Sequence, residues 1–72
     1  MDANKIGFLR RQDYRLNRAV ECIEHSVEAF VDSEFYAKEF ADFTNRLESC
    51  LREIKSIRSA IGDKADELGG AA

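Results

Sequence analysis

Proline is absent from this chain of 72 residues, and glycine occurs only four times. Residues 8–61 contain neither of these residues, which are the strongest breakers of helices. No apolar run approaches the roughly 18 residues that a membrane-spanning helix requires, and no signal peptide is recognisable. We therefore expect no membrane segment, and we expect the protein to be cytoplasmic.

The residue types that most often carry chemistry are scarce as well. Two cysteines and one histidine are too few to build a zinc site from protein ligands. The chain has no glycine-rich phosphate loop and no serine–histidine–acid set at a meaningful spacing. We therefore expect no metal, no cofactor, no small-molecule substrate and no enzymatic activity. Cys22 and Cys50 are expected to be free thiols in a reducing compartment.

Apolar and charged residues dominate what is present, at 44% and 35% of the chain. A chain of this length forms one domain at most, residues 1–72. A single core of this size rarely yields more than ~3–5 kcal/mol of stability. The composition therefore predicts a small domain that gains stability from a partner.

In the second half of the chain, apolar residues recur in alternating steps of four and three. This is the spacing of a coiled-coil seam, and it predicts a helix over about 34–61. The predicted seam consists of Tyr36, Phe40, Phe43, Leu47, Cys50, Ile54, Ile57 and Ile61. Gly62 follows at the place of a C-terminal cap, so residues 62–72 are expected to form a loose tail, within which Asp63 to Leu68 can add one helical turn.

The first half shows the same spacing and predicts a helix over about 5–31. Its seam residues are Leu9, Leu16, Val20, Ile23, Val27 and Phe30. Asp13 interrupts this seam with a carboxylate. Two interpretations stay open: Asp13 remains hydrated at the seam edge, or it is a polar residue that fixes register or partner choice.

The two seams are out of phase, because six residues separate Phe30 from Tyr36 where an unbroken heptad needs seven. Asp32 and Ser33 lie in this gap, and both are good N-cap residues. We therefore predict an all-α antiparallel two-helix hairpin with a turn at about 32–34. In the expected register Phe30 lies beside Tyr36. The alternative is one continuous helix, since no glycine or proline enforces a turn.

A two-helix hairpin has one seam, yet further apolar residues flank it on both helices, among them Phe8, Val31 and Leu51. Two helices alone cannot cover a stripe of this width. The sequence therefore predicts assembly into a four-helix bundle as a homodimer, or docking on another protein.

Charge is segregated along the chain. Residues 1–18 hold five basic and two acidic side chains, whereas residues 19–45 hold one basic and seven acidic side chains. A hairpin should therefore be basic at its open end and acidic around its turn. This polarity favours an antiparallel arrangement of two copies.

The densest basic cluster is the candidate binding site, and it interleaves a tyrosine among arginines: Arg10, Arg11, Tyr14, Arg15 and Arg18. The sequence favours a small non-enzymatic protein–protein interaction module, such as an adaptor, chaperone or inhibitor, that uses this cluster and its heptad stripes. The alternative is a homodimeric RNA-binding regulator that uses the same cluster. That alternative resembles, in length and two-helix layout alone, the plasmid copy-number regulators that bind kissing RNA loops. The net charge of −3 counts against it.

Overall fold

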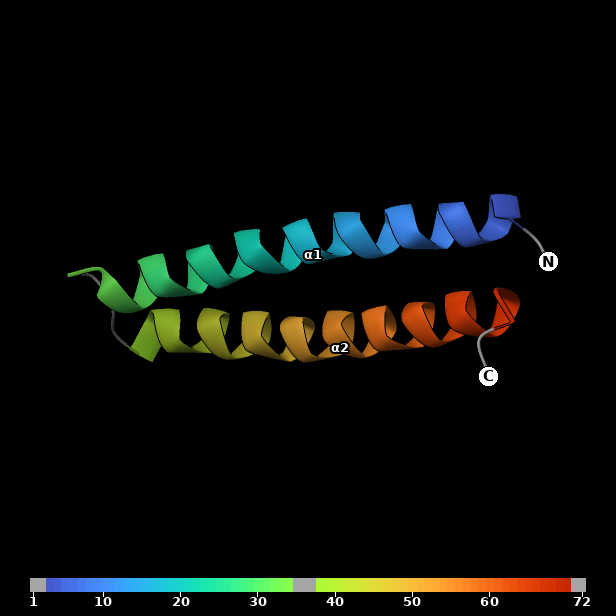
Figure 1. The fold of residues 1–72 in the computed structure, drawn as a ribbon. Helices are drawn as coiled ribbons and strands as arrows, with labels where there is room; N and C mark the ends of the chain where they lie inside the picture. Colours follow the sequence, from blue (N-terminus) through green and yellow to red (C-terminus); the bar gives the residue numbers. More distant parts are fainter. Residues whose placement is uncertain (1–2, 35–37, 71–72) are drawn as a thin grey trace.

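The computed structural model describes residues 3–34 and 38–70. Helix α1 spans Ala3–Asp32 and helix α2 spans Lys38–Leu68. The two helices run side by side in opposite directions, so that both termini lie at the same end of the molecule (Figure 1). The predicted all-α helical hairpin is therefore confirmed, and the single continuous helix is excluded.

The second helix lies further along the chain than the sequence predicted. It begins at Lys38 rather than at about residue 34, and it continues through Gly62 to Leu68. Asp32 is the last residue of α1, and Ser33 lies in the bend after it, so neither residue caps α2. One glycine costs a helix only ~1 kcal/mol, and the apolar spacing resumes beyond Gly62. The predicted helix end at residue 61 and the predicted loose tail were therefore wrong for residues 62–68, whereas Gly69 and Gly70 lie in a turn after the helix and residues 71–72 lie outside the described residues.

Helix α1 buries the stripe that its heptad predicts. Val20 is buried at 4% exposure. Half-buried residues continue the same stripe on both sides of it: Leu9, Leu16, Ile23, Val27 and Phe30. The stripe also includes the half-buried Ile6, whose Cδ1 would lie 3.8 Å from a Cβ added to Gly69, the residue after α2.

Helix α2 buries only half of the stripe expected from its sequence. Phe40, Leu47, Ile54 and Ile61 are half-buried, as a seam position requires. The alternate seam position, however, falls one residue later than predicted and is occupied by Thr44, Leu51, Arg58 and Ala65. Phe43, Cys50 and Ile57, which were predicted on the seam, are exposed beside it. The remaining predicted seam residue, Tyr36, lies outside the described residues.

This shift places polar residues in the seam of α2, and each of the two has a partner. Thr44 is 2% exposed, and its hydroxyl donates a hydrogen bond of 2.9 Å to the carbonyl oxygen of Ala41. Arg58 donates from Nε to Asp13 Oδ1 at 2.9 Å and from Nη1 to Asn17 Oδ1 at 2.8 Å. A charged side chain at one seam position is thus matched by the opposite charge at another.

The register therefore differs from the predicted one. Phe30 packs against Phe40, with ring centroids 5.6 Å apart, instead of lying beside Tyr36. Asp13 meets Arg58 instead of Ile54. The helices are offset by at least one turn from the expected alignment, and this offset gives the carboxylate of Asp13 a cationic partner, which the predicted alignment lacked.

Replacing Gly62 with alanine should stabilise the hairpin. A Cβ at this position meets no atom within 4 Å, and alanine is favoured over glycine inside a helix by roughly 0.5–1 kcal/mol. Chemical unfolding followed by circular dichroism should show a gain of this size. Gly70→Ala is the control, because its φ of 75° disfavours alanine, and it should give no gain. A loss of stability in Gly62→Ala would contradict the path of α2 through residue 62.

Leu51→Ala should lower the free energy of unfolding by about 2 kcal/mol or more, because Leu51 is 8% exposed and leaves a cavity in the seam. Val31→Ala is the matched control. Val31 is 49% exposed, so its truncation should cost no more than about 0.5–1 kcal/mol. Equal costs in urea unfolding would show that the buried stripe of α2 is misassigned.

Asp13 and Arg58 should be energetically coupled. Their side chains are 39% and 28% exposed, so a double-mutant cycle with alanine at each position should give a coupling free energy of about 0.5–1.5 kcal/mol. The Asp42–Arg46 pair on α2 should give a smaller coupling free energy, because its side chains are 70% and 73% exposed. A coupling no larger than that of the exposed pair would refute a register role for Asp13 and Arg58.

Candidate interaction surface

The hairpin has two long sides that flank the seam between α1 and α2, and these two sides differ in chemistry. One side, here called the charged flank, is crossed by polar pairs along its length. Arg10 pairs with Asp66 at 3.6 Å, and Glu24 pairs with Lys55 at 3.9 Å. The hydrogen bond from Arg58 to Asn17 lies between them. Charged side chains therefore cover the seam on this flank.

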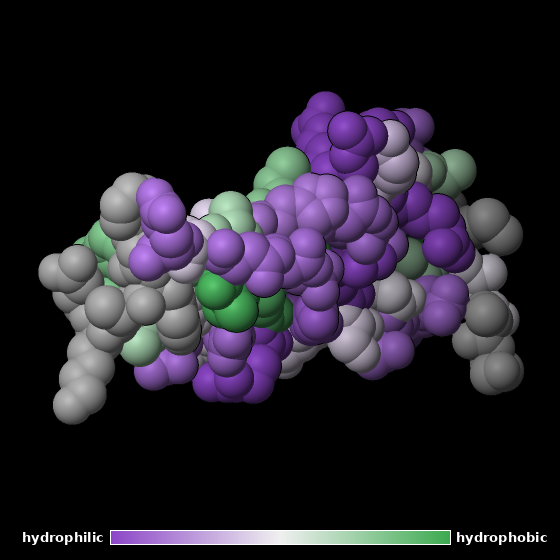
Figure 2. All heavy atoms as spheres, turned by 90° about the vertical axis from the view of Figure 1, so that its left-hand side faces the viewer, coloured by the Kyte–Doolittle hydropathy of each residue, from purple (hydrophilic) through white to green (hydrophobic). Residues whose placement is uncertain are grey.

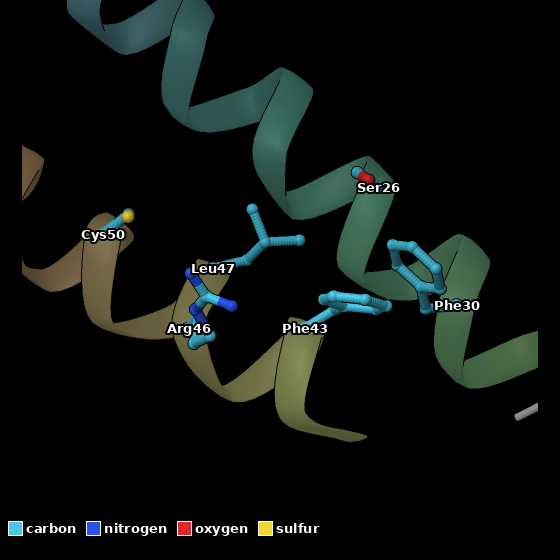
Figure 3. Close-up of a pocket in the computed structure, with 6 residues that line it drawn as sticks. All are labelled: Ser26, Phe30, Phe43, Arg46, Leu47 and Cys50. Atoms are coloured by element: carbon cyan, nitrogen blue, oxygen red, sulfur yellow. The ribbon is translucent and has the colours of Figure 1, made fainter. Parts of the chain in front are cut away.

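The opposite side carries an open groove between the helices. Its lining comes from both helices and consists of Ser26, Phe30, Phe43, Arg46, Leu47 and Cys50. Figure 3 shows the rings of Phe43 and Phe30 facing one another, with Leu47 pointing toward α1. Phe30, Phe40 and Phe43 form an aromatic cluster near the turn, with centroids 5.6–6.3 Å apart, which is the range of favourable ring packing.

Heptad spacing extends this groove into a continuous surface. Phe43, Cys50 and Ile57 follow one another at seven-residue steps on α2, and Ala19 precedes Ser26 by the same step on α1. Cys22 lies one turn before Ser26 and thus on the same side of α1. We call this surface the apolar flank, and it consists of Ala19, Cys22, Ser26 and Ala29 on α1 with Phe43, Cys50 and Ile57 on α2.

The apolar flank is exposed to solvent in the single chain. Phe43 is 47% exposed and Ile57 is 43% exposed. Among the described residues, only Val20, Leu51 and Ala65 are apolar side chains with almost complete burial. Viewed along the hairpin from the turn, hydrophobic atoms reach the surface between hydrophilic side chains (Figure 2). Large apolar side chains exposed on one side of a molecule and bordered by polar residues are typical of a binding surface.

The arginine–tyrosine cluster lies on the outer side of α1, near the open end. Tyr14 is 61% exposed, and its hydroxyl accepts a hydrogen bond from Arg18 Nη1 at 3.2 Å. Arg10 faces the charged flank and pairs with Asp66. Three members of the cluster, Arg10, Tyr14 and Arg18, are therefore engaged within the chain, and Arg11 and Arg15 complete its exposed surface.

The charge distribution differs from the predicted one, because α2 extends to Leu68. Asp66 and Glu67 belong to this helix and lie at the same end as the arginine–tyrosine cluster. The open end is therefore partly neutralised, and Lys55 meets the acidic half of α1 at Glu24. The strong polarity is confined to α1, whose first half is basic and whose second half is acidic.

Few features of the described residues suggest other chemistry. In residues 3–34 and 38–70, no three side chains of histidine, cysteine, aspartate or glutamate gather as they would around a metal ion. Neither α1 nor α2 has an apolar stretch long enough to span a bilayer. His25 is exposed on α1, and Cys22 and Cys50 are free thiols, both exposed.

The chain matches no protein-family model, no curated protein and no solved structure. Its function is therefore inferred from its own geometry. The apolar flank was partly visible in the sequence, since Phe43, Cys50 and Ile57 stand out as a periodic set. Their exposure was missed, because the same spacing also fits a buried seam.

Proposed function

We propose that this chain is a small non-enzymatic protein–protein interaction module that binds its partner through the apolar flank. The observation that carries this proposal is the exposure of Phe43 and Ile57, at 47% and 43%, on one continuous side of the hairpin. Aromatic and branched apolar side chains of this kind are typical of the centre of an interface.

The asymmetry of the two flanks supports the choice of surface. The charged flank satisfies its polar groups within the chain, through pairs such as Arg58–Asp13 and Lys55–Glu24. On the apolar flank, burial of the exposed part of each large side chain would contribute roughly 25 cal/mol for every Å² removed from water. Association through this flank therefore gains free energy without breaking the pairs of the other flank.

The arginine–tyrosine cluster has a secondary part in this proposal. Arg15 lies one turn before Ala19 and therefore borders the apolar flank. At such a rim, a charge affects the rate and selectivity of association more than its final strength. The pairing of Arg10 with Asp66 reduces the positive charge that an RNA ligand would meet, so we favour a protein partner. The two free thiols suit a reducing compartment, and we propose a cytoplasmic location.

The proposal is tested by affinity capture with matched variants as bait. The wild-type chain and Val31→Asp should retain the same protein partners, counting a second, differently tagged copy of the chain among them. Phe43→Asp and Ile57→Asp should lose these partners, while circular dichroism shows that their helices persist. Val31 is the matched control because its exposure, 49%, is close to that of Phe43.

The proposal would be overturned if the flank variants captured the same proteins as the wild type. It would also be overturned if binding were lost only in Tyr14→Ala and Arg15→Ala and were sensitive to ribonuclease. That second result would establish the RNA-binding alternative.

A further inference from the structure

The single chain exposes more surface than a compact protein of its mass. Its solvent-accessible area is 5435 Å², whereas a monomeric globular protein of 8.2 kDa is expected to expose about 4500 Å². Its radius of gyration is 16.3 Å, against about 11 Å for a compact chain of this length. The excess area, roughly 900 Å², is close to the ~800 Å² that each partner buries in an interface of standard size.

The long sides of the hairpin offer an area of this size. The Cα envelope measures 52 × 15 × 14 Å, so one side has a projected area of roughly 800 Å², which suffices for a standard interface. The apolar flank occupies the middle of such a side, where Phe43 and Ile57 are about 21 Å apart along α2. A second hairpin has a side of the same dimensions and can cover both the flank and the polar residues beyond it.

The charges along α1 are complementary to those of the same helix in a second, antiparallel copy. The first half of this helix, up to Arg18, holds one acidic residue, Asp13, and five basic ones: Lys5, Arg10, Arg11, Arg15 and Arg18. The second half has no lysine or arginine and holds four carboxylates: Glu21, Glu24, Glu28 and Asp32. Two α1 helices that lie antiparallel place each basic half beside an acidic half, which favours association.

We infer that the partner on the apolar flank is a second copy of this chain, and that the two hairpins pack antiparallel into a four-helix bundle with α1 against α1. This inference deepens the proposed function and rests on it. Two identical sides that meet face to face obey a two-fold axis in the interface. If the axis is perpendicular to the helices, the two copies run in opposite directions, and α1 of one copy lies on α1 of the other. If it runs along the helices, it places α1 on α2 and brings both basic halves to the same end.

The side chains of the apolar flank suit this arrangement. On α1 they are small, with Ala19, Ser26 and Ala29 in succession, so two α1 helices can approach closely. On α2 the larger Phe43 of one copy meets Ile57 of the other, because Cys50, midway between them in the sequence, lies near the same axis. The residues of α1 that follow Arg15 on this flank are uncharged as far as Ala29, and Cys22 lies midway along this stretch. The axis should therefore pass close to Cys22.

Sedimentation equilibrium at micromolar concentration tests whether the chain binds a second copy of itself. The wild-type chain and Val31→Asp should have twice the 8.2 kDa chain mass. Phe43→Asp and Ile57→Asp should raise the dimer dissociation constant at least about 30-fold, as loss of an interface hot spot does. Circular dichroism checks that the variants remain helical. If Phe43→Asp unfolds, Ile57→Asp alone tests whether the dimer depends on the apolar flank.

The two cysteines test the alignment. After mild oxidation, Cys50→Ser should still form a covalent dimer through Cys22 and its symmetry mate, and Cys22→Ser should still form one through Cys50 and its symmetry mate, because both cysteines lie at a similar level near the axis. If each single variant abolished the cross-link, Cys22 of one copy would be joined to Cys50 of the other. That result would require α1 on α2 and would overturn the antiparallel alignment.

If the wild-type chain were monomeric, the inference that a second copy covers the apolar flank would be overturned. If its flank variants still lost a different protein in the capture experiment, the proposed function would stand while this inference failed. Equal dissociation of Val31→Asp and Phe43→Asp would also overturn the inference, because the dimer would then not depend on the apolar flank.

Discussion

Two helices can share only one seam, and this constraint governs the rest of the molecule. Each helix presents one stripe to the other, so the hairpin gives almost complete burial to few apolar side chains, of which the described residues include Val20, Leu51 and Ala65. An apolar stripe wider than the seam has to remain in water or find another surface. The exposed apolar flank is thus a direct consequence of the architecture, and the proposed association supplies the burial that the hairpin alone lacks.

The seam is held in register by polar contacts as well as by apolar packing. Leucines and isoleucines at seven-residue steps pack nearly as well after a slip of one heptad, so they specify alignment weakly. The interaction of Arg58 with Asp13 and Asn17 exists in only one alignment, and a slip would leave a half-buried charge without its partner. The same contact therefore trades some stability for a defined register, as single polar residues do in coiled coils.

Heptad spacing was sufficient to predict the helices and the hairpin, but not the choice of stripe on α2. Phe40, Leu47, Ile54 and Ile61 belong to either candidate stripe. Hydrophobicity then favours Phe43, Cys50 and Ile57 over Thr44, Leu51 and Arg58, although the second set is the buried one. The buried stripe also places Arg58 beside Asp13, a contact between residues 45 positions apart in the sequence that no local pattern reveals. The end of α2 was missed for a related reason, because Gly62 is a local signal and the burial of Ala65 beside residues of α1 is not.

A distance measurement between the two native cysteines tests the central claim, that the chain doubles back with this register. Spin labels on Cys22 and Cys50, with labelled chain diluted in unlabelled chain, report the separation within one molecule. Both residues lie on the apolar flank at a similar level along the hairpin, and packed helices are ~8–10 Å apart. Double electron–electron resonance should therefore give a distance between the two labels below about 20 Å. A straight helix would separate the two residues by about 42 Å, and a distance near that value would contradict the account.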